Sequence, residues 1–189
     1  MKKIILDLCG GTGSWAKPYK EAGYDVRIIT LPDNDILTYE PPENVYGILS
    51  APPCTMFSLA RTTAKTPRDL DAGMEIAKGC LRIIWKAKPK FWAMENPRGL
   101  LRKFMGKPAF AFDASEFFED YNKHTDLWGY FNEPKKNRDY VRFDSTDKNT
   151  RKLPLIPKEY KIDEKMSKVA IRRSITPAGF AQAFFEANQ

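Results

Sequence analysis

One cysteine of this chain stands where the backbone has little freedom. Cys54 directly follows Pro52 and Pro53, and two prolines fix the backbone and remove two hydrogen-bond donors. A thiol held at a fixed position is a candidate nucleophile, because the thiolate is the reactive form. A free thiol is more often a small buried apolar group. Cys9 and Cys80 lie within apolar patterns and fit that second interpretation better.

The charge around Cys54 favours the thiolate. No acid lies between residues 46 and 68, whereas Arg61, Lys65 and Arg68 do. Nearby cations lower the pKa of a thiol, so we expect Cys54 to be a reactive thiol.

An acid ends another apolar run. Glu95 follows Phe91-Trp92-Ala93-Met94 and precedes Asn96-Pro97. A carboxyl group at the end of a buried strand can hydrogen-bond or protonate a ring nitrogen of a base. Taken alone, the same pattern also fits a glutamate that reaches solvent or caps the next helix.

A glycine-rich segment follows the first apolar run, Asp7-Leu8-Cys9-Gly10-Gly11-Thr12-Gly13-Ser14. Glycines after a strand let a ligand approach the backbone, and the start of a following helix offers free N–H groups. The spacing is not that of a dinucleotide-binding fingerprint, so a Rossmann-type oxidoreductase is a poor interpretation. By itself the segment fits a tight strand-to-helix turn equally well.

Alternating strands and helices must position these three segments. A parallel sheet that is covered on both faces binds ligands beyond the carboxyl ends of its strands, so we expect the segments to meet at one edge of the sheet. The 69–88 helix rests on apolar residues at helical spacing. The final helix begins at Pro177 with Thr176 as its N-cap. The pattern predicts strands at 3–8, 25–30, 46–50, 91–95, 110–112 and 127–131, and helices at 15–22, 69–88 and from 177.

Composition limits the class of protein. The 189 residues are enough for one α/β domain, in which 133–158 reads as a polar excursion. No apolar run reaches the roughly 20 residues that a membrane span needs, so we expect a cytoplasmic protein without membrane contact. The absence of a CxxC pair gives no indication of a metal site or a disulfide framework. The formal net charge of +7 favours a polyanionic partner, although a solvated basic surface would give the same value.

In this order, the three segments resemble the carbon-5 cytosine DNA methyltransferase family, and most closely its compact, often phage-encoded branch. That family has a glycine loop after its first strand, a Pro-Pro-Cys loop after its fourth and a Glu-Asn pair on its fifth. The later stretches Lys123-His124-Thr125-Asp126-Leu127-Trp128 and 172–180 are also similar to that branch. The resemblance implies a Rossmann-like, S-adenosylmethionine-dependent methyltransferase fold with a mostly parallel sheet.

The resemblance also implies roles for residues. Cys54 would attack carbon 6 of a cytosine that is flipped out of the DNA, Glu95 would contact ring nitrogen 3, and carbon 5 would take the methyl group. The expected cofactor-binding residues are Asp7, Cys9, Gly11, Gly13, Ser14, Trp15, Asp35 and Pro52. The expected nucleic-acid-binding residues are Ser58, Arg61, Asn96, Arg98, Lys123, Thr125, Lys135, Lys136 and Arg138.

Some positions depart from the family pattern. Cys9 stands where an aromatic residue is usual, and Thr30 stands where an acid usually ends the second strand. The Gln-x-Arg-x-Arg segment of the family is not clearly present, and the region available for reading a target sequence is small. We therefore expect a short or relaxed sequence preference, or a partner or second copy of the chain that supplies specificity. Two alternatives stay open: an RNA cytosine methyltransferase, and a non-catalytic nucleic-acid-binding module on a methyltransferase scaffold.

Overall fold

One twisted sheet forms the centre of the chain. A computed structural model describes the chain except for residues 1, 60, 62–63, 145–152, 159 and 161–167. The described strands are β1 (Ile4–Leu8), β2 (Asp25–Ile29), β3 (Val45–Ser50), β4 (Phe91–Pro97), β5 (Phe110–Asp113) and β6 (His124–Tyr130). The helices are α1 (Lys17–Glu21), α2 (Leu70–Ala87), α3 (Arg102–Met105), the 3-10 helix η1 (Ala114–Phe117), α4 (Lys168–Ser174) and α5 (Ala178–Ala187).

The strands of the described sheet run in the order β2-β1-β3-β4-β6-β5. The first four are parallel, and β6 runs antiparallel to both β4 and β5. The central strands β1, β3 and β4 are buried almost throughout, as expected when helices cover both faces of a parallel sheet. The predicted α/β architecture with a mostly parallel sheet is confirmed.

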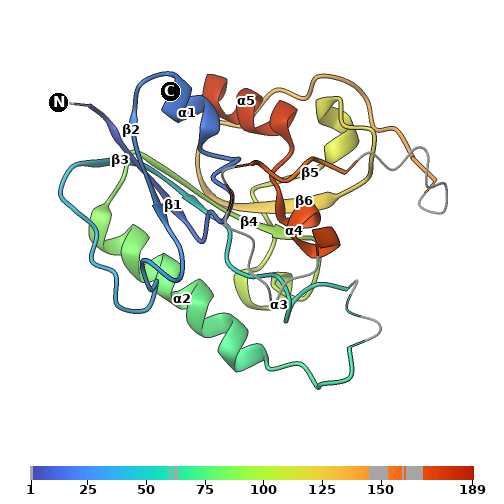
Figure 1. Ribbon diagram of the computed structural model, residues 1–189, viewed down its shortest axis with the longest axis horizontal. Coiled ribbons are helices and arrows are strands. Elements are labelled where there is room, and N and C mark those ends of the chain that lie inside the picture. Colours follow the sequence, from blue (N-terminus) through green and yellow to red (C-terminus); the bar gives the residue numbers. More distant parts are fainter. Residues whose placement is uncertain (1, 60, 62–63, 145–152, 159, 161–167) are drawn as a thin grey trace.

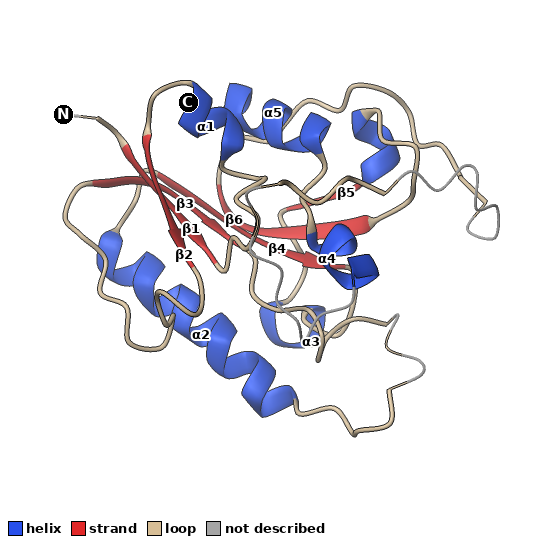
Figure 2. Ribbon diagram, viewed as in Figure 1, coloured by secondary structure: helices blue, strands red, loops and turns tan. Residues whose placement is uncertain are grey.

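Helices cover the two faces of the sheet unequally. α1 and α5 lie over one face, and the long α2 crosses the other (Figure 1, Figure 2). The α1/α5 side is rich in aromatic residues: Phe112 stacks on Phe180 with ring centroids 4.1 Å apart, and Trp15 packs against Phe180 and Phe184. The α2 side is mainly aliphatic. No helix in the described part of the chain has the length and apolarity needed to cross a membrane.

The boundaries of two predicted helices follow side-chain chemistry. Asp69 caps α2 by accepting a hydrogen bond from the Ala72 N–H at 2.9 Å, close to the predicted start. The prediction that Thr176 caps the last helix is wrong. Pro177 occupies the cap position without a side-chain hydrogen bond, and the carboxylate of Glu119 accepts from the Ala178 N–H at 3.0 Å. A residue distant in sequence thus supplies the partner that a local cap would have provided.

The path from β2 to β3 is shorter than the resemblance implied. Residues 30–44 contain turns but no strand, so the Pro-Pro-Cys loop follows the third strand of this chain rather than the fourth. The guanidinium of Arg82 on α2 holds this segment by donating to the carbonyl groups of Ile36 and Tyr39, and it pairs with Glu40 at 3.0 Å. Contacts with α2 therefore fix a segment that has no strand partner.

Candidate active site

The three predicted segments meet at one edge of the sheet. Leu8 at the end of β1 pairs with Ser50 at the end of β3, and Ser50 pairs with Met94 on β4. The Ala51 N–H donates to the Leu8 carbonyl at 2.9 Å, which continues this pairing beyond the strands. The prediction that the glycine loop, the Pro-Pro-Cys loop and the Glu-Asn pair share one edge is therefore confirmed.

A buried amide fastens the Pro-Pro-Cys loop to β4. Asn96 has no exposed surface, and its Nδ2 donates to the Pro52 carbonyl at 2.9 Å. Beyond Cys54 the chain turns back at once, because the Cys54 carbonyl accepts from the Phe57 and Ser58 N–H groups. These contacts hold the thiol at a fixed place relative to Glu95, which is the neighbour of Asn96 on β4.

Asn96→Ala is expected to loosen this junction. Loss of a buried hydrogen bond leaves the Pro52 carbonyl without a partner and should lower the free energy of unfolding by about 1–3 kcal/mol. Catalytic turnover should fall more than cofactor affinity, because the Cys54 loop loses its anchor while the glycine loop keeps its own contacts. Chemical denaturation and steady-state kinetics measure the two effects. Asn137→Ala, at an exposed position, is the matched control, and equal behaviour of the two variants would contradict this role.

Glu95 and Lys123 form a nearly buried ion pair beside Cys54. The Lys123 Nζ lies 3.3 Å from Oε1 of Glu95, with only 14% and 11% of the side chains exposed. This contact lacks hydrogen-bond geometry, and Oε1 has no hydrogen-bond partner among the described residues. The carboxylate therefore keeps the capacity to accept or share a hydrogen bond with a ligand.

The thiol of Cys54 is less acidic than its sequence neighbours suggested. Burial raises the pKa of Cys54, the carboxylate of Glu95 raises it further, and the ammonium of Lys123 opposes both effects. Arg61 and Arg68 are not among the groups that set this pKa: Arg68 donates to the carbonyls of Met56 and Ser58, and Arg61 to Thr66 and the Pro67 carbonyl. The expectation that the local charge favours the thiolate is therefore wrong. Lys123 pairs with Glu95, and Asn96, the neighbour of Glu95, holds the Pro52 carbonyl, so Cys54, Glu95 and Lys123 lie at one site.

The glycine loop leaves a buried acid without a partner. Asp7 is fully buried, and neither of its carboxylate oxygens has a hydrogen-bond partner among the described residues. Burial raises the pKa of Asp7 to about 7 from an ordinary 3.8. A Cβ at Gly10 would lie 2.3 Å from the Asp7 carboxyl carbon, whereas Gly11 adopts a φ of +50° with open space beside it. A buried, unpaired carboxylate beside half-buried loop backbone fits the ammonium and carboxylate of an amino-acid ligand such as the methionine part of S-adenosylmethionine.

Asp7→Asn is expected to separate stability from ligand binding. Because the pKa of Asp7 is raised in the folded state, wild type loses stability as the pH rises from about 4 to about 7, by at most about 4 kcal/mol. The variant has no proton to lose there, so its Tm relative to wild type should rise through the same pH range. Its affinity for S-adenosylmethionine should fall by at least about tenfold, because the cationic ligand loses its carboxylate partner.

Differential scanning calorimetry at pH 5 and pH 8 and titration calorimetry with the cofactor measure these two effects. Asp33→Asn removes an exposed acid and serves as the control. A Tm difference between Asp7→Asn and wild type that stays constant with pH would contradict the assignment of this pKa shift.

The other residues that were predicted to bind the cofactor differ in burial and in the partners they contact. The Cys9 sulfur lies 4.0 Å from that of Cys80, a partner on α2 rather than a ligand. Trp15 is only 2% exposed and its ring belongs to the aromatic core, so its contact with a cofactor stays a prediction. Asp35 is exposed, and its Oδ1 accepts from the Leu37 N–H at 2.9 Å. Thr12 and Ser14 join their hydroxyl groups across the glycine loop at 2.6 Å.

Several predicted nucleic-acid contacts are used inside the protein. These residues are Asn96, bonded to Pro52; Thr125, buried with its hydroxyl donating to the Lys123 carbonyl; Lys136, paired with Glu116 at 2.9 Å; and Arg138, which donates to the Ser115 and Glu119 carbonyls. Ser58 forms an isolated bridge with Gly99. Arg98 and Lys135 are exposed at the surface. The sequence shows which residues carry a positive charge, but it does not show which of them bind to groups inside the protein.

The predicted site residues do not include Asp126, a buried acid on β6. Its side chain has no exposed surface and receives two hydrogen bonds from the Arg102 guanidinium, each at 2.5 Å. The charge of Arg102 is therefore paired inside the protein. An acid within a buried strand is the available signal, although the sequence does not indicate its partner.

Comparisons with known proteins agree with this arrangement. The family model described as C-5 cytosine-specific DNA methylase matches residues 16–135, more than half of the chain. A solved structure described as a DNA modification methyltransferase encoded within a prophage of E. coli has a TM-score of 0.51 at 15% identity. That match covers 68% of this chain and 47% of the other, so the chain spans about half the length of that protein.

A second solved structure, described as a DhpI-SAM-HEP complex, has a TM-score of 0.28 at 13% identity and covers 67% of this chain and 63% of that one. This likeness is too low to bear on the fold. A search of curated protein sequences found no match.

Proposed function

Because the chain belongs to the C-5 cytosine-specific DNA methylase family, we propose that it transfers a methyl group from S-adenosylmethionine to carbon 5 of cytosine in DNA. The observation that carries the proposal is the grouping of Cys54, Glu95 and Lys123 at the edge of the sheet where the glycine loop ends. A nucleophile, an acid and a cofactor loop at one edge are the parts that this reaction needs.

Cys54 acts as the nucleophile in the proposed reaction. Its sulfur bonds to carbon 6 of the cytosine, which makes carbon 5 nucleophilic towards a methyl donor. The buried thiol must first lose its proton to solvent, and its raised pKa makes this step unfavourable at neutral pH. After methylation a base from solvent takes the carbon-5 proton. The electrons of that C–H bond re-form the double bond between carbons 5 and 6, and the sulfur leaves carbon 6 as a thiolate.

Glu95 acts on the opposite side of the pyrimidine ring. Its carboxylate binds at ring nitrogen 3 and shares a proton there, which stabilises the negative charge that the attacking sulfur brings. Lys123 fixes the orientation of this carboxylate through the 3.3 Å ion pair. Asn96 keeps the strand that carries Glu95 in register with the Pro-Pro-Cys loop.

S-adenosylmethionine supplies an electrophilic methyl group when it is bound. Asp7 and the backbone of Gly11 and Gly13 would hold its methionine part, and Asp35 would contact its adenine. Cys54 and Glu95 lie at a sheet edge that a stacked base cannot enter, so the target cytosine must be flipped out of the duplex. The formal net charge of +7 supports a polyanionic substrate.

A methyl-transfer assay tests the proposal. Purified chain is incubated with S-adenosylmethionine carrying a labelled methyl group and with duplex DNA, single-stranded DNA or RNA of the same base sequence. We expect label in 5-methylcytosine of DNA, identified after hydrolysis to nucleosides. Label found only in RNA would indicate that RNA is the substrate. DNA binding without any methyl transfer would favour a non-catalytic nucleic-acid-binding module. Adenine methylation would contradict the proposed chemistry.

A further inference from the structure

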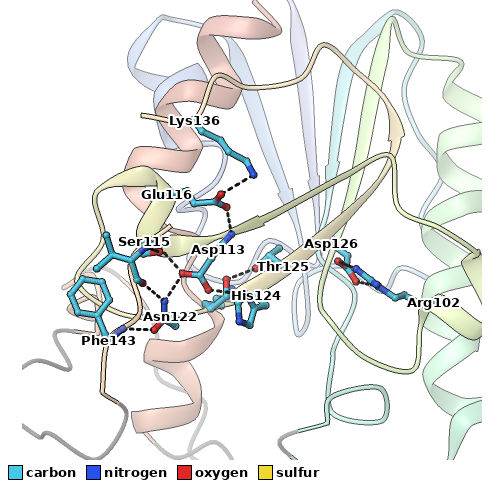
Figure 3. A network of polar contacts seen from close by, with 12 residues as sticks. Arg102, Asp113, Ser115, Glu116, Asn122, His124, Thr125, Asp126, Lys136 and Phe143 are labelled. Carbon is cyan, nitrogen blue, oxygen red and sulfur yellow. Dashed lines mark hydrogen bonds and ion pairs between the residues drawn. The ribbon is translucent and has the colours of Figure 1, made fainter. Parts of the chain in front are cut away.

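The single histidine of the chain is held by a buried acid. His124 begins β6, directly opposite Asp113 on β5, and its Nδ1 lies 3.1 Å from Asp113 Oδ2 (Figure 3). The Asp113 side chain is 2% exposed, whereas that of His124 is 47% exposed. A carboxylate this close to Nδ1 restrains the ring orientation. Nε2 is then the nitrogen that remains for a ligand.

Asp113 cannot turn away from the imidazole. Its Oδ1 accepts from the Ser115 N–H at 3.0 Å and from Asn122 Nδ2 at 2.8 Å. Those two bonds leave Oδ2 close to Nδ1 of His124, a contact without hydrogen-bond geometry, and Oδ2 has no hydrogen-bond partner among the described residues. The orientation of the histidine is therefore set by a carboxylate that is itself anchored at the start of η1.

The segment 133–144 braces the other side of the same histidine. The Tyr140 ring lies parallel to the imidazole, with centroids 6.0 Å apart and planes inclined by 22°. Arg138 anchors the segment to the Ser115 and Glu119 carbonyls, and the Val141 carbonyl accepts from Asn122 at 2.8 Å. The part of the predicted polar excursion that the structure describes is thus docked against η1 and holds Tyr140 in place.

The braced histidine lies next to the candidate active site. Lys123, its neighbour in sequence, pairs with Glu95. The His124 carbonyl accepts from the Arg98 N–H at 3.0 Å, so the chain leaving the Glu-Asn pair runs beside it. Arg98 is exposed. The partly exposed imidazole of His124 and the exposed guanidinium of Arg98 thus come from adjoining segments of backbone. Both segments lie a short distance along β4 and β6 from Glu95.

We propose that Nε2 of His124 binds a backbone phosphate of DNA seated at the active site. The inference rests on the proposed function only in taking DNA as the substrate. An Nε2–H group of the ring can donate a hydrogen bond to a phosphate oxygen. Asp113 and Tyr140 face the ring, and the cations Lys123 and Arg98 flank it along the backbone, where they attract the same anion.

His124→Gln tests the inference through DNA binding alone, without cofactor. Fluorescence anisotropy with a labelled cytosine-containing duplex gives Kd over a range of salt concentrations. The variant should bind about tenfold more weakly than wild type, the effect of one charge-assisted hydrogen bond. The slope of log K against log salt should shrink by about one, the loss of one phosphate contact.

Lys20→Gln on α1 removes an exposed charge far along the chain from this site and is the matched control. Equal Kd values for His124→Gln and wild type, or weaker binding with an unchanged salt slope, would overturn the phosphate contact. The readout requires no methyl transfer. A chain that binds DNA through His124 but transfers no methyl group would therefore refute the proposed function and leave this inference standing.

Discussion

Cys54→Ser is expected to lower methyl transfer to DNA by at least about 1,000-fold, because a hydroxyl group cannot replace a thiolate as the nucleophile. Cofactor affinity should stay near that of wild type, since the glycine loop is unchanged. In wild type the single-turnover rate should rise with pH above neutrality, because burial and Glu95 raise the pKa of Cys54 and leave little thiolate at pH 7.

Single-turnover assays with labelled cofactor measure both effects. Thr55→Ala, which alters the exposed neighbour of Cys54, controls for disturbance of the loop and should keep most of the activity. Retention of substantial transfer by Cys54→Ser would rule out covalent catalysis by this cysteine. A rate that falls as the pH rises from 7 to 9 would contradict the direction of the pKa shift.

Glu95→Gln is expected to lower methyl transfer by about 100- to 10,000-fold, the usual contribution of a group that shares a proton with the reacting ring. The thiol should respond in the opposite direction. The carboxylate of Glu95 raises the pKa of Cys54, whereas Lys123 lowers it. Removing the carboxylate charge should therefore increase the thiolate fraction at pH 8, and iodoacetamide should alkylate Cys54 severalfold faster than in wild type.

These opposite changes distinguish a catalytic carboxylate from a structural one, since a damaged fold would not combine lost transfer with faster, selective alkylation. Peptide mapping assigns the alkylated residue. Glu75→Gln, on the exposed side of α2, should leave both rates unchanged. Slower alkylation of Cys54 in Glu95→Gln would show that the carboxylate does not act on the thiol as described.

The sequence predicted the parts of this site that depend on local pattern. Apolar runs marked the central strands, and the parallel arrangement then required the segments after β1, β3 and β4 to meet at one edge. Asp69 marked the start of α2 because a helix N-cap is a local signal. The Pro-Pro-Cys and Glu-Asn segments were identified for the same reason: each is a short, contiguous motif.

The sequence could not predict features that depend on partners distant along the chain. The basic residues near Cys54 suggested a thiolate, yet the pKa of Cys54 follows its burial and Glu95, which lies on another strand. Lys136 and Arg138 were predicted to contact nucleic acid, yet both have partners inside the protein. The cap of α5 comes from Glu119 rather than from Thr176. In each case a tertiary contact outweighed a local indication. Residues 145–152, 159 and 161–167 lie outside the described part of the chain, so the expected reading of a target sequence stays a prediction.

Trapping on 5-fluorocytosine tests the covalent bond between Cys54 and cytosine most directly. Fluorine at carbon 5 cannot leave as a proton does, so the adduct should persist after methylation. With a preparation that methylates ordinary DNA, we predict a denaturant-resistant protein–DNA complex that requires S-adenosylmethionine, and mass spectrometry should place the nucleotide on the peptide that contains Cys54. Failure of the active protein to form this complex, or attachment of the DNA to another residue, would contradict the account.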